Sequence, residues 1–129
     1  MTNKDLPYAP PGPVAPDAIR RHFETDDGGF EVGIVIDAKS HRSPLLLGLE
    51  WVRVGTEPVS WAADQATHET YYLQQGQLRV DWEGDHNGTA ELRRGDSFYF
   101  PPSHRYTIVN TGDEDVFLIW SLYPSPDSP

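Results

Sequence analysis

Short hydrophobic runs, separated at close intervals by Gly, Asp, Asn and Pro, make up most of the chain. Runs of this length that are rich in β-branched and aromatic residues are typical of strands. Residues 77–82 (QLRVDW) alternate polar and apolar positions, and the stretch GDHNG at 84–88 predicts a hairpin turn. The pattern predicts eight strands in all, at residues 30–36, 45–54, 69–73, 77–82, 90–92, 97–100, 106–109 and 116–123.

One segment has a helical pattern. Residues 17–24 (DAIRRHFE) predict a short helix, with Asp17 as its N-cap or as an acid in its first turn. No helices alternate with the eight strands, which argues against a parallel sheet. The pattern therefore predicts an all-β sandwich or barrel with one short N-terminal helix.

The prolines divide the chain into three parts. The chain has 129 residues, enough for one domain, and eight of its 12 prolines lie near the two ends. Because proline disfavours regular structure, we expect an extended arm at residues 1–16, a domain at 17–123 and a tail at 124–129. Leu6, Tyr8 and Val14 are the apolar anchors by which the arm is expected to lie on a sheet edge, of its own subunit or a partner.

Composition narrows the classes of partner. The formal net charge is −10, so we expect neither nucleic acid nor an anionic membrane surface as a partner. The chain has no cysteine, which excludes disulfides, thiolate metal sites and a cysteine nucleophile. The N-terminus shows no signal-peptide pattern, and no apolar run reaches 18 residues, so a cytoplasmic protein is expected.

Two glycine-anchored segments have a recognisable spacing. The first covers residues 55–76 (GTEPVSWAADQATHETYYLQQG), in which Glu69 stands seven residues before the final glycine. The second covers residues 95–110 (GDSFYFPPSHRYTIVN). In these segments the chain resembles a small single-domain cupin, a double-stranded β-helix of the jelly-roll type, over roughly residues 30–123. The resemblance implies a barrel whose mouth binds one small metabolite, in a protein that forms a homodimer.

The usual cupin metal ligands are substituted. The family's first motif contributes His-x-His and Glu, and its second motif contributes another His. Counting from either end of residues 55–76 places Trp61 and Ala63, Ala63 and Gln65, or Ala62 and Asp64 at the first two His positions. Tyr106 occupies the third His position, and Ser103 stands where the family has glycine, so Glu69 is the one ligand retained. No cofactor is favoured, although a divalent transition metal held by Gln65, Glu69 and His104 is left open.

A metal-free pocket with the same walls is the favoured interpretation. Burial among aromatic residues is expected to raise the pKa of Glu69 towards neutrality, which suits a general acid or base. Tyr106 and His104 are its expected catalytic partners. The expected substrate-binding residues are Trp61, Gln65, Tyr71, Arg53 and Trp120.

Three functions remain open at this point. The first is an enzyme that catalyses an isomerisation, cyclisation, dehydration or lyase step by proton transfer at Glu69. The second is a non-catalytic module that binds a small molecule in the same pocket. The third is a metalloenzyme with the substituted site Gln65, Glu69 and His104.

Overall fold

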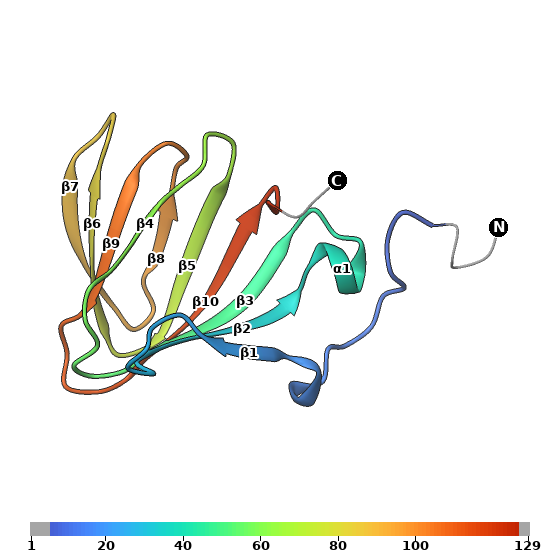
Figure 1. Cartoon of the computed structure of the whole chain (residues 1–129), viewed down its shortest axis with the longest axis horizontal. Helices are drawn as coiled ribbons and strands as arrows, with labels where there is room; N and C mark the ends of the chain where they lie inside the picture. The colour runs from blue at the N-terminus through green and yellow to red at the C-terminus, as the bar shows by residue number, and fades with distance from the viewer. Residues whose placement is uncertain (1–5, 127–129) are drawn as a thin grey trace.

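The computed structural model describes residues 6–126, which form two antiparallel sheets facing each other (Figure 1). The larger sheet has the strand order β1-β2-β3-β10-β5-β8, and the smaller has the order β4-β9-β6-β7. The strands of the larger sheet are β1 (Arg20–Phe23), β2 (Phe30–Ile36), β3 (Leu46–Val52), β5 (His68–Gln75), β8 (Ser97–Phe100) and β10 (Val116–Tyr123). Those of the smaller sheet are β4 (Val59–Ala62), β6 (Gln77–Glu83), β7 (Gly88–Arg93) and β9 (Arg105–Asn110). The all-β jelly-roll prediction is confirmed.

Strand β10 joins the two parts of the larger sheet. It pairs with β3 on one side and with β5 on the other, so residues distant in sequence form continuous rows. Trp120 lies between Gly48 and Tyr71, and Leu122 lies beside Glu69. Side chains alternate between the two faces of a strand, so these rows point towards the smaller sheet.

The core fills the space between the sheets with aromatic and branched side chains. Its largest fully buried members are Tyr106, Phe100, Leu73, Leu78, Ile108, Leu118, Val52, Val80 and Val116. The ring of Phe100 packs edge-on against Tyr71 and Tyr106, at centroid distances of 4.5 and 4.8 Å. This packing leaves a cavity between the two sheets, which both of them line.

The helical prediction for residues 17–24 is corrected by the structure. Only Pro16–Ala18 forms a 3-10 turn, and the next residues form β1, which pairs with β2. The strand is favoured because Arg21 reaches Glu31 across the pair and also lies over the ring of Trp51. The one α-helix of residues 6–126 is α1 (Ala38–His41), capped by Asp37, whose side chain accepts a hydrogen bond from the Ser40 N–H. None of the described helices is long and apolar enough to cross a membrane.

Both ends of the chain, as far as the structure describes them, contact the domain. The Ala9 N–H donates to the His41 carbonyl at 3.0 Å, so the described part of the arm contacts α1. Ser125 is buried, and its N–H donates to the Pro44 carbonyl at 2.7 Å, so the segment after β10 packs on the domain. Tyr8 is 55% exposed, and Leu6 and Val14 are half-buried. Contact of the arm with a partner subunit stays a prediction; residues 1–5 and 127–129 lie outside the described residues.

A substitution at Gly48 tests how closely Trp120 packs on the backbone of β3. A Cβ at Gly48 would overlap the Trp120 indole and lie 2.6 Å from the Gly33 carbonyl oxygen. Because the neighbouring backbone is part of the sheet, we expect Gly48→Ala to lower the free energy of unfolding by about 1–3 kcal/mol, measured by urea denaturation. Gly12→Ala is the matched control, because nothing lies within 4 Å of a Cβ there. Equal stability of the two variants would contradict this packing.

Candidate functional site: an acidic cavity with aromatic walls

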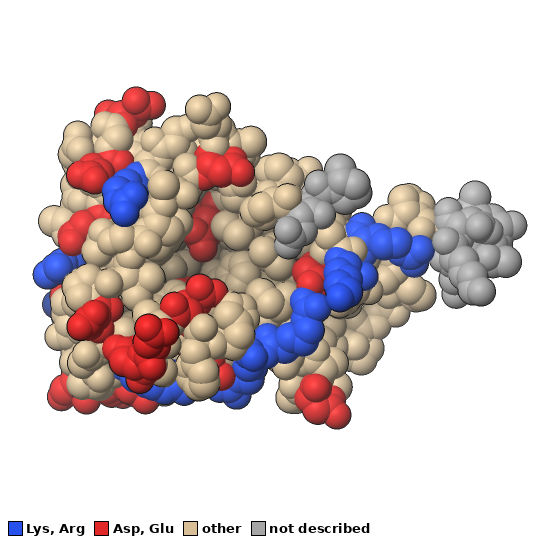
Figure 2. Space-filling model, in the orientation of Figure 1, with Lys and Arg blue, Asp and Glu red and all other residues tan. Residues whose placement is uncertain are grey.

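A cavity of about 510 Å³ opens between the two sheets. Its walls come from β1, β2, β3, β5 and β10 on one side and from β4 and the loop after β4 on the other. Figure 2 shows that this face of the molecule is hollowed near its middle, with acidic side chains gathered around the hollow. A volume of this size suits a small organic ligand.

Trp120 and Glu50 lie together on one wall of the cavity. The Trp120 indole covers Gly48 and donates its Nε1–H to the Leu49 carbonyl at 3.0 Å. Glu50 lies two residues beyond Gly48 on β3 and therefore shares its face. The Glu50 side chain is buried, at 3% exposure, and lines the cavity. An aromatic ring and a carboxylate are thus next to each other on the same wall.

Glu69 supplies a second carboxyl group, at the end of the row formed with Leu122 and Phe100. Burial raises its pKa from 4.5 to about 8, although a hydrogen bond from the Trp61 side chain acts in the opposite direction. Glu69 therefore carries its proton at neutral pH. This agrees with the expectation from sequence that aromatic surroundings raise the pKa of this residue.

Glu50 and Tyr71 form a buried polar pair. The Tyr71 hydroxyl donates to Glu50 Oε1 at 3.3 Å. Burial raises the pKa of Glu50 well above 4.5, and repulsion from Glu69 raises it further, while the hydrogen bond from Tyr71 lowers it. Burial also raises the pKa of Tyr71 well above its ordinary value. The two carboxyl groups are thus held in surroundings that disfavour their charged forms.

Four of the expected site residues come together in the cavity wall: Trp61, Glu69, Tyr71 and Trp120. Trp61 reaches it from β4, opposite the larger sheet, and packs 5.7 Å from Phe100 and 5.6 Å from Tyr106 between ring centroids. Trp61 and Ala63 share the inward face, which agrees with the alignment counted forward from the first glycine of residues 55–76.

The two expected catalytic partners of Glu69 do not line the cavity, and each is hydrogen-bonded to other groups. Tyr106 is 1% exposed, and its hydroxyl donates to the Pro101 carbonyl at 2.5 Å. Burial raises its pKa to about 12. His104 stacks on His86 of the β6–β7 hairpin, and its Nδ1 lies 2.9 Å from the Pro102 carbonyl oxygen. The His86 N–H donates to His104 Nε2 at 3.2 Å, so both ring nitrogens of His104 have partners.

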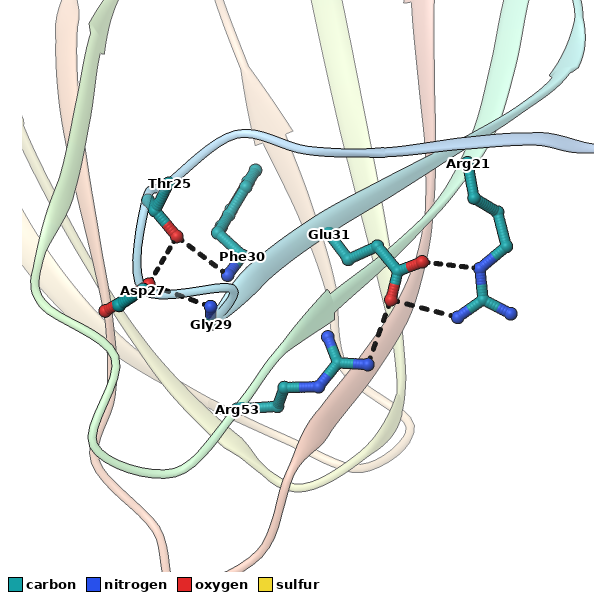
Figure 3. A network of polar contacts seen from close by, with 7 residues as sticks. All are labelled: Arg21, Thr25, Asp27, Gly29, Phe30, Glu31 and Arg53. Carbon is teal, nitrogen blue, oxygen red and sulfur yellow. Dashed lines mark hydrogen bonds and ion pairs between the residues drawn. The ribbon is translucent and has the colours of Figure 1, made fainter.

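Gln65 and Arg53 also lie away from the cavity wall. Gln65 is exposed in the loop after β4. Arg53 follows β3 and, with Arg21, binds the buried Glu31 on the outer side of β2 (Figure 3). The Arg53 Nη2 to Glu31 Oε1 distance is 2.9 Å. This ion cluster lowers the pKa of Glu31 through its hydrogen bonds with Arg21 and Arg53.

Three ionisable cavity residues were not among the sequence-based candidates: His22, Glu24 and Glu50. Glu50 had a signal in the sequence, because it is the single charged residue within the apolar run LLLGLEWV at 45–52. A carboxylate inside an apolar strand is costly to bury without a purpose. His22 and Glu24 had no such signal, because they lie in the segment that was expected to be helical.

The family model of the cupin domain matches residues 50–122, more than half of the chain. The chain belongs to the cupin family. No curated protein matches it in sequence.

Ser103 takes a left-handed conformation, with φ at 65°, where the family has glycine. Glycine adopts this conformation without strain, which explains why it is usual at that turn.

Solved structures with the same fold have diverse descriptions. KdgF from Halomonas sp. is 20% identical, with a TM-score of 0.67 over 88% of this chain and 95% of that one. Hydroxypropylphosphonic acid epoxidase from S. wedmorenis is 13% identical, with a TM-score of 0.69 over 83% and 56%. The cupin domain of Schizosaccharomyces pombe Cnp3 is 17% identical, with a TM-score of 0.64 over 74% and 65%. The chain thus spans less than two thirds of the last two, and these similarities show the fold.

The residues at the family's metal positions do not fit a metal. Cupins often bind metals, and HppE in its Fe(II) form is among the similar structures. Here Trp61 and Ala63 offer no ligand atom, and the hydroxyl of Tyr106 is bound to a carbonyl. The set Gln65, Glu69 and His104 is not brought together, and residues 6–126 contain no group of three His, Asp or Glu side chains suited to a metal.

The raised pKa of Glu69 predicts how stability depends on pH. The folded state holds this proton more tightly than the unfolded chain, in which the pKa is near 4.5. The resulting stabilisation is complete below about 4.5 and is lost as the pH rises through about 8. We expect Glu69→Gln to remove this loss, which is at most about 1.4 kcal/mol per pH unit.

The measurement is urea denaturation of wild type and variant at pH 5, 7 and 9. Glu83→Gln, at an exposed position on β6, is the control and should follow the wild type. If the difference between wild type and Glu69→Gln stays constant across this range, the pKa of Glu69 is not raised.

Proposed function

We propose that this cupin is an enzyme that moves a proton on a small organic substrate, with Glu69 as the general acid. The observation that carries the proposal is a carboxyl group that faces a ligand-sized cavity and has a pKa of about 8. A group with that pKa is protonated at pH 7 and can still give up its proton readily, which suits acid catalysis near neutrality. Isomerisation, cyclisation, dehydration and lyase steps all use such a transfer.

The walls support this chemistry by restricting water and by providing a flat surface for the substrate. Trp61, Tyr71 and Trp120 line the cavity together with Phe30 and branched residues of β2. The Trp61 side chain hydrogen-bonds Glu69 and so orients its carboxyl group. The Tyr71 hydroxyl donates to Glu50 and lines the same cavity as Glu69, and Tyr71 replaces Tyr106 and His104 as the proposed polar partner.

The activity is tested by incubating the protein in D₂O with a panel of small carbon-acid and hydroxy-acid metabolites, followed by proton NMR. We expect exchange or conversion of at least one compound. Glu69→Gln should lower its rate by roughly 10²–10⁴-fold, because a positioned general acid contributes about that much. The rate should also fall above pH 8, where the wild-type residue loses its proton.

Glu83→Gln serves again as the control and should keep the wild-type rate. Binding without turnover by the wild type would instead favour a non-catalytic module. Turnover that is unchanged in Glu69→Gln would contradict the proposed role of this residue.

A further inference from the structure

The cavity wall is acidic and lacks a permanent cation. Four carboxyl-bearing residues line it: Glu24, Glu50, Asp64 and Glu69. No Lys or Arg of residues 6–126 is in the lining, and the one basic side chain there is His22. The Nε2 of His22, on β1, lies 2.6 Å from Oε1 of Glu24, which follows that strand, and both side chains are about half exposed. An anionic ligand would therefore find no Lys or Arg side chain to pair with in these walls.

Aromatic rings lie beside these carboxyl groups. One face of the Trp120 indole lies on Gly48, and Trp120 also lines the cavity next to Glu50. Tyr71 neighbours Trp120 in the sheet and donates to Glu50. The negative face of an aromatic ring attracts an organic cation, most strongly when the site is shielded from water.

Glu50 is buried with little around it that could balance a negative charge on its carboxyl group. It is 3% exposed, and the hydrogen bond that its carboxyl group accepts from Tyr71 is long, at 3.3 Å. A buried carboxylate is normally paired or richly hydrogen-bonded. A cation in the cavity would favour ionisation of Glu50, with its proton released to solvent, and the Tyr71 hydroxyl would stabilise the resulting carboxylate.

We propose that the ligand of this cavity carries a substituted ammonium group, with Glu50 as its counter-ion and Trp120 and Tyr71 as its aromatic walls. The inference rests on the proposed function in placing the ligand in the same cavity, where Glu69 is left to carry the proton. The volume of about 510 Å³ and the aromatic walls favour an organic cation over a bare metal ion. The absence of a three-residue donor group among the described residues agrees with this choice.

The test compares cations with neutral molecules of similar shape by isothermal titration calorimetry. Choline is paired with 3,3-dimethylbutan-1-ol, and phenethylamine is paired with 2-phenylethanol. We expect at least one cation to bind about tenfold more tightly than its neutral partner, because it gains both the ion pair and the aromatic contact.

Variants assign this preference to particular residues. Glu50→Gln keeps the shape of the side chain and should abolish the preference, whereas the exposed control Glu83→Gln should keep it. Trp120→Phe should weaken binding of the cation several-fold, because the phenyl ring attracts cations less strongly than indole. Far-UV circular dichroism and thermal unfolding establish that each variant is folded, and Trp120→Phe provides an independent result if Glu50→Gln does not fold.

Any of three outcomes would overturn the inference. The first is that neither cation binds the wild type more tightly than its neutral partner. The second is that a folded Glu50→Gln variant keeps the preference, and the third is that Trp120→Phe binds the cation as tightly as the wild type. The proposed function is judged separately by turnover in Glu69→Gln, so loss of turnover without a cation preference would leave proton transfer standing and remove the ammonium ligand.

Discussion

The two hydrogen-bonded ladders of strand β10 set the geometry on which the cavity depends. Its register with β3 places Trp120 opposite Gly48, and its register with β5 places Leu122 opposite Glu69. Because side chains alternate, a slip of one residue in either ladder would turn the inward row towards solvent. Gly48 is part of the same constraint, since the Trp120 indole occupies the space that any larger side chain would need.

The cavity holds two carboxyl groups in surroundings that oppose their ionisation. Desolvation is the largest cause of the raised pKa of both Glu50 and Glu69. On the outer side of the larger sheet the buried Glu31 is instead held between two arginines, and its pKa is lowered. The protein thus compensates one buried carboxylate internally and leaves two facing a space that a ligand can fill. That difference is the physical basis for assigning function to the cavity.

The substituted metal positions form a packed aromatic group. Trp61 and Tyr106 pair across β4 and β9, and both pack against Phe100. The rings fill volume, and the Tyr106 hydroxyl is satisfied by a backbone carbonyl. The side chains of Trp61 and Tyr106 therefore serve packing, while Glu69 faces the cavity. The proposed acid–base chemistry needs only this carboxyl group.

The sequence by itself determined the all-β fold, eight of the ten strands and the position of Glu69, because hydrophobic alternation and motif spacing are local properties of the chain. It also indicated Trp61, Tyr71 and Trp120 as wall residues. The strand β1 was not predictable, since its Arg-Arg-His-Phe sequence is stabilised by pairing with β2 and by Glu31. Only the tertiary structure decided that Glu50 faces the cavity and that Arg53 and His104 do not. These outcomes depend on which face of each strand is covered by the opposite sheet, and on partners such as His86 and Glu31 that lie far away along the chain.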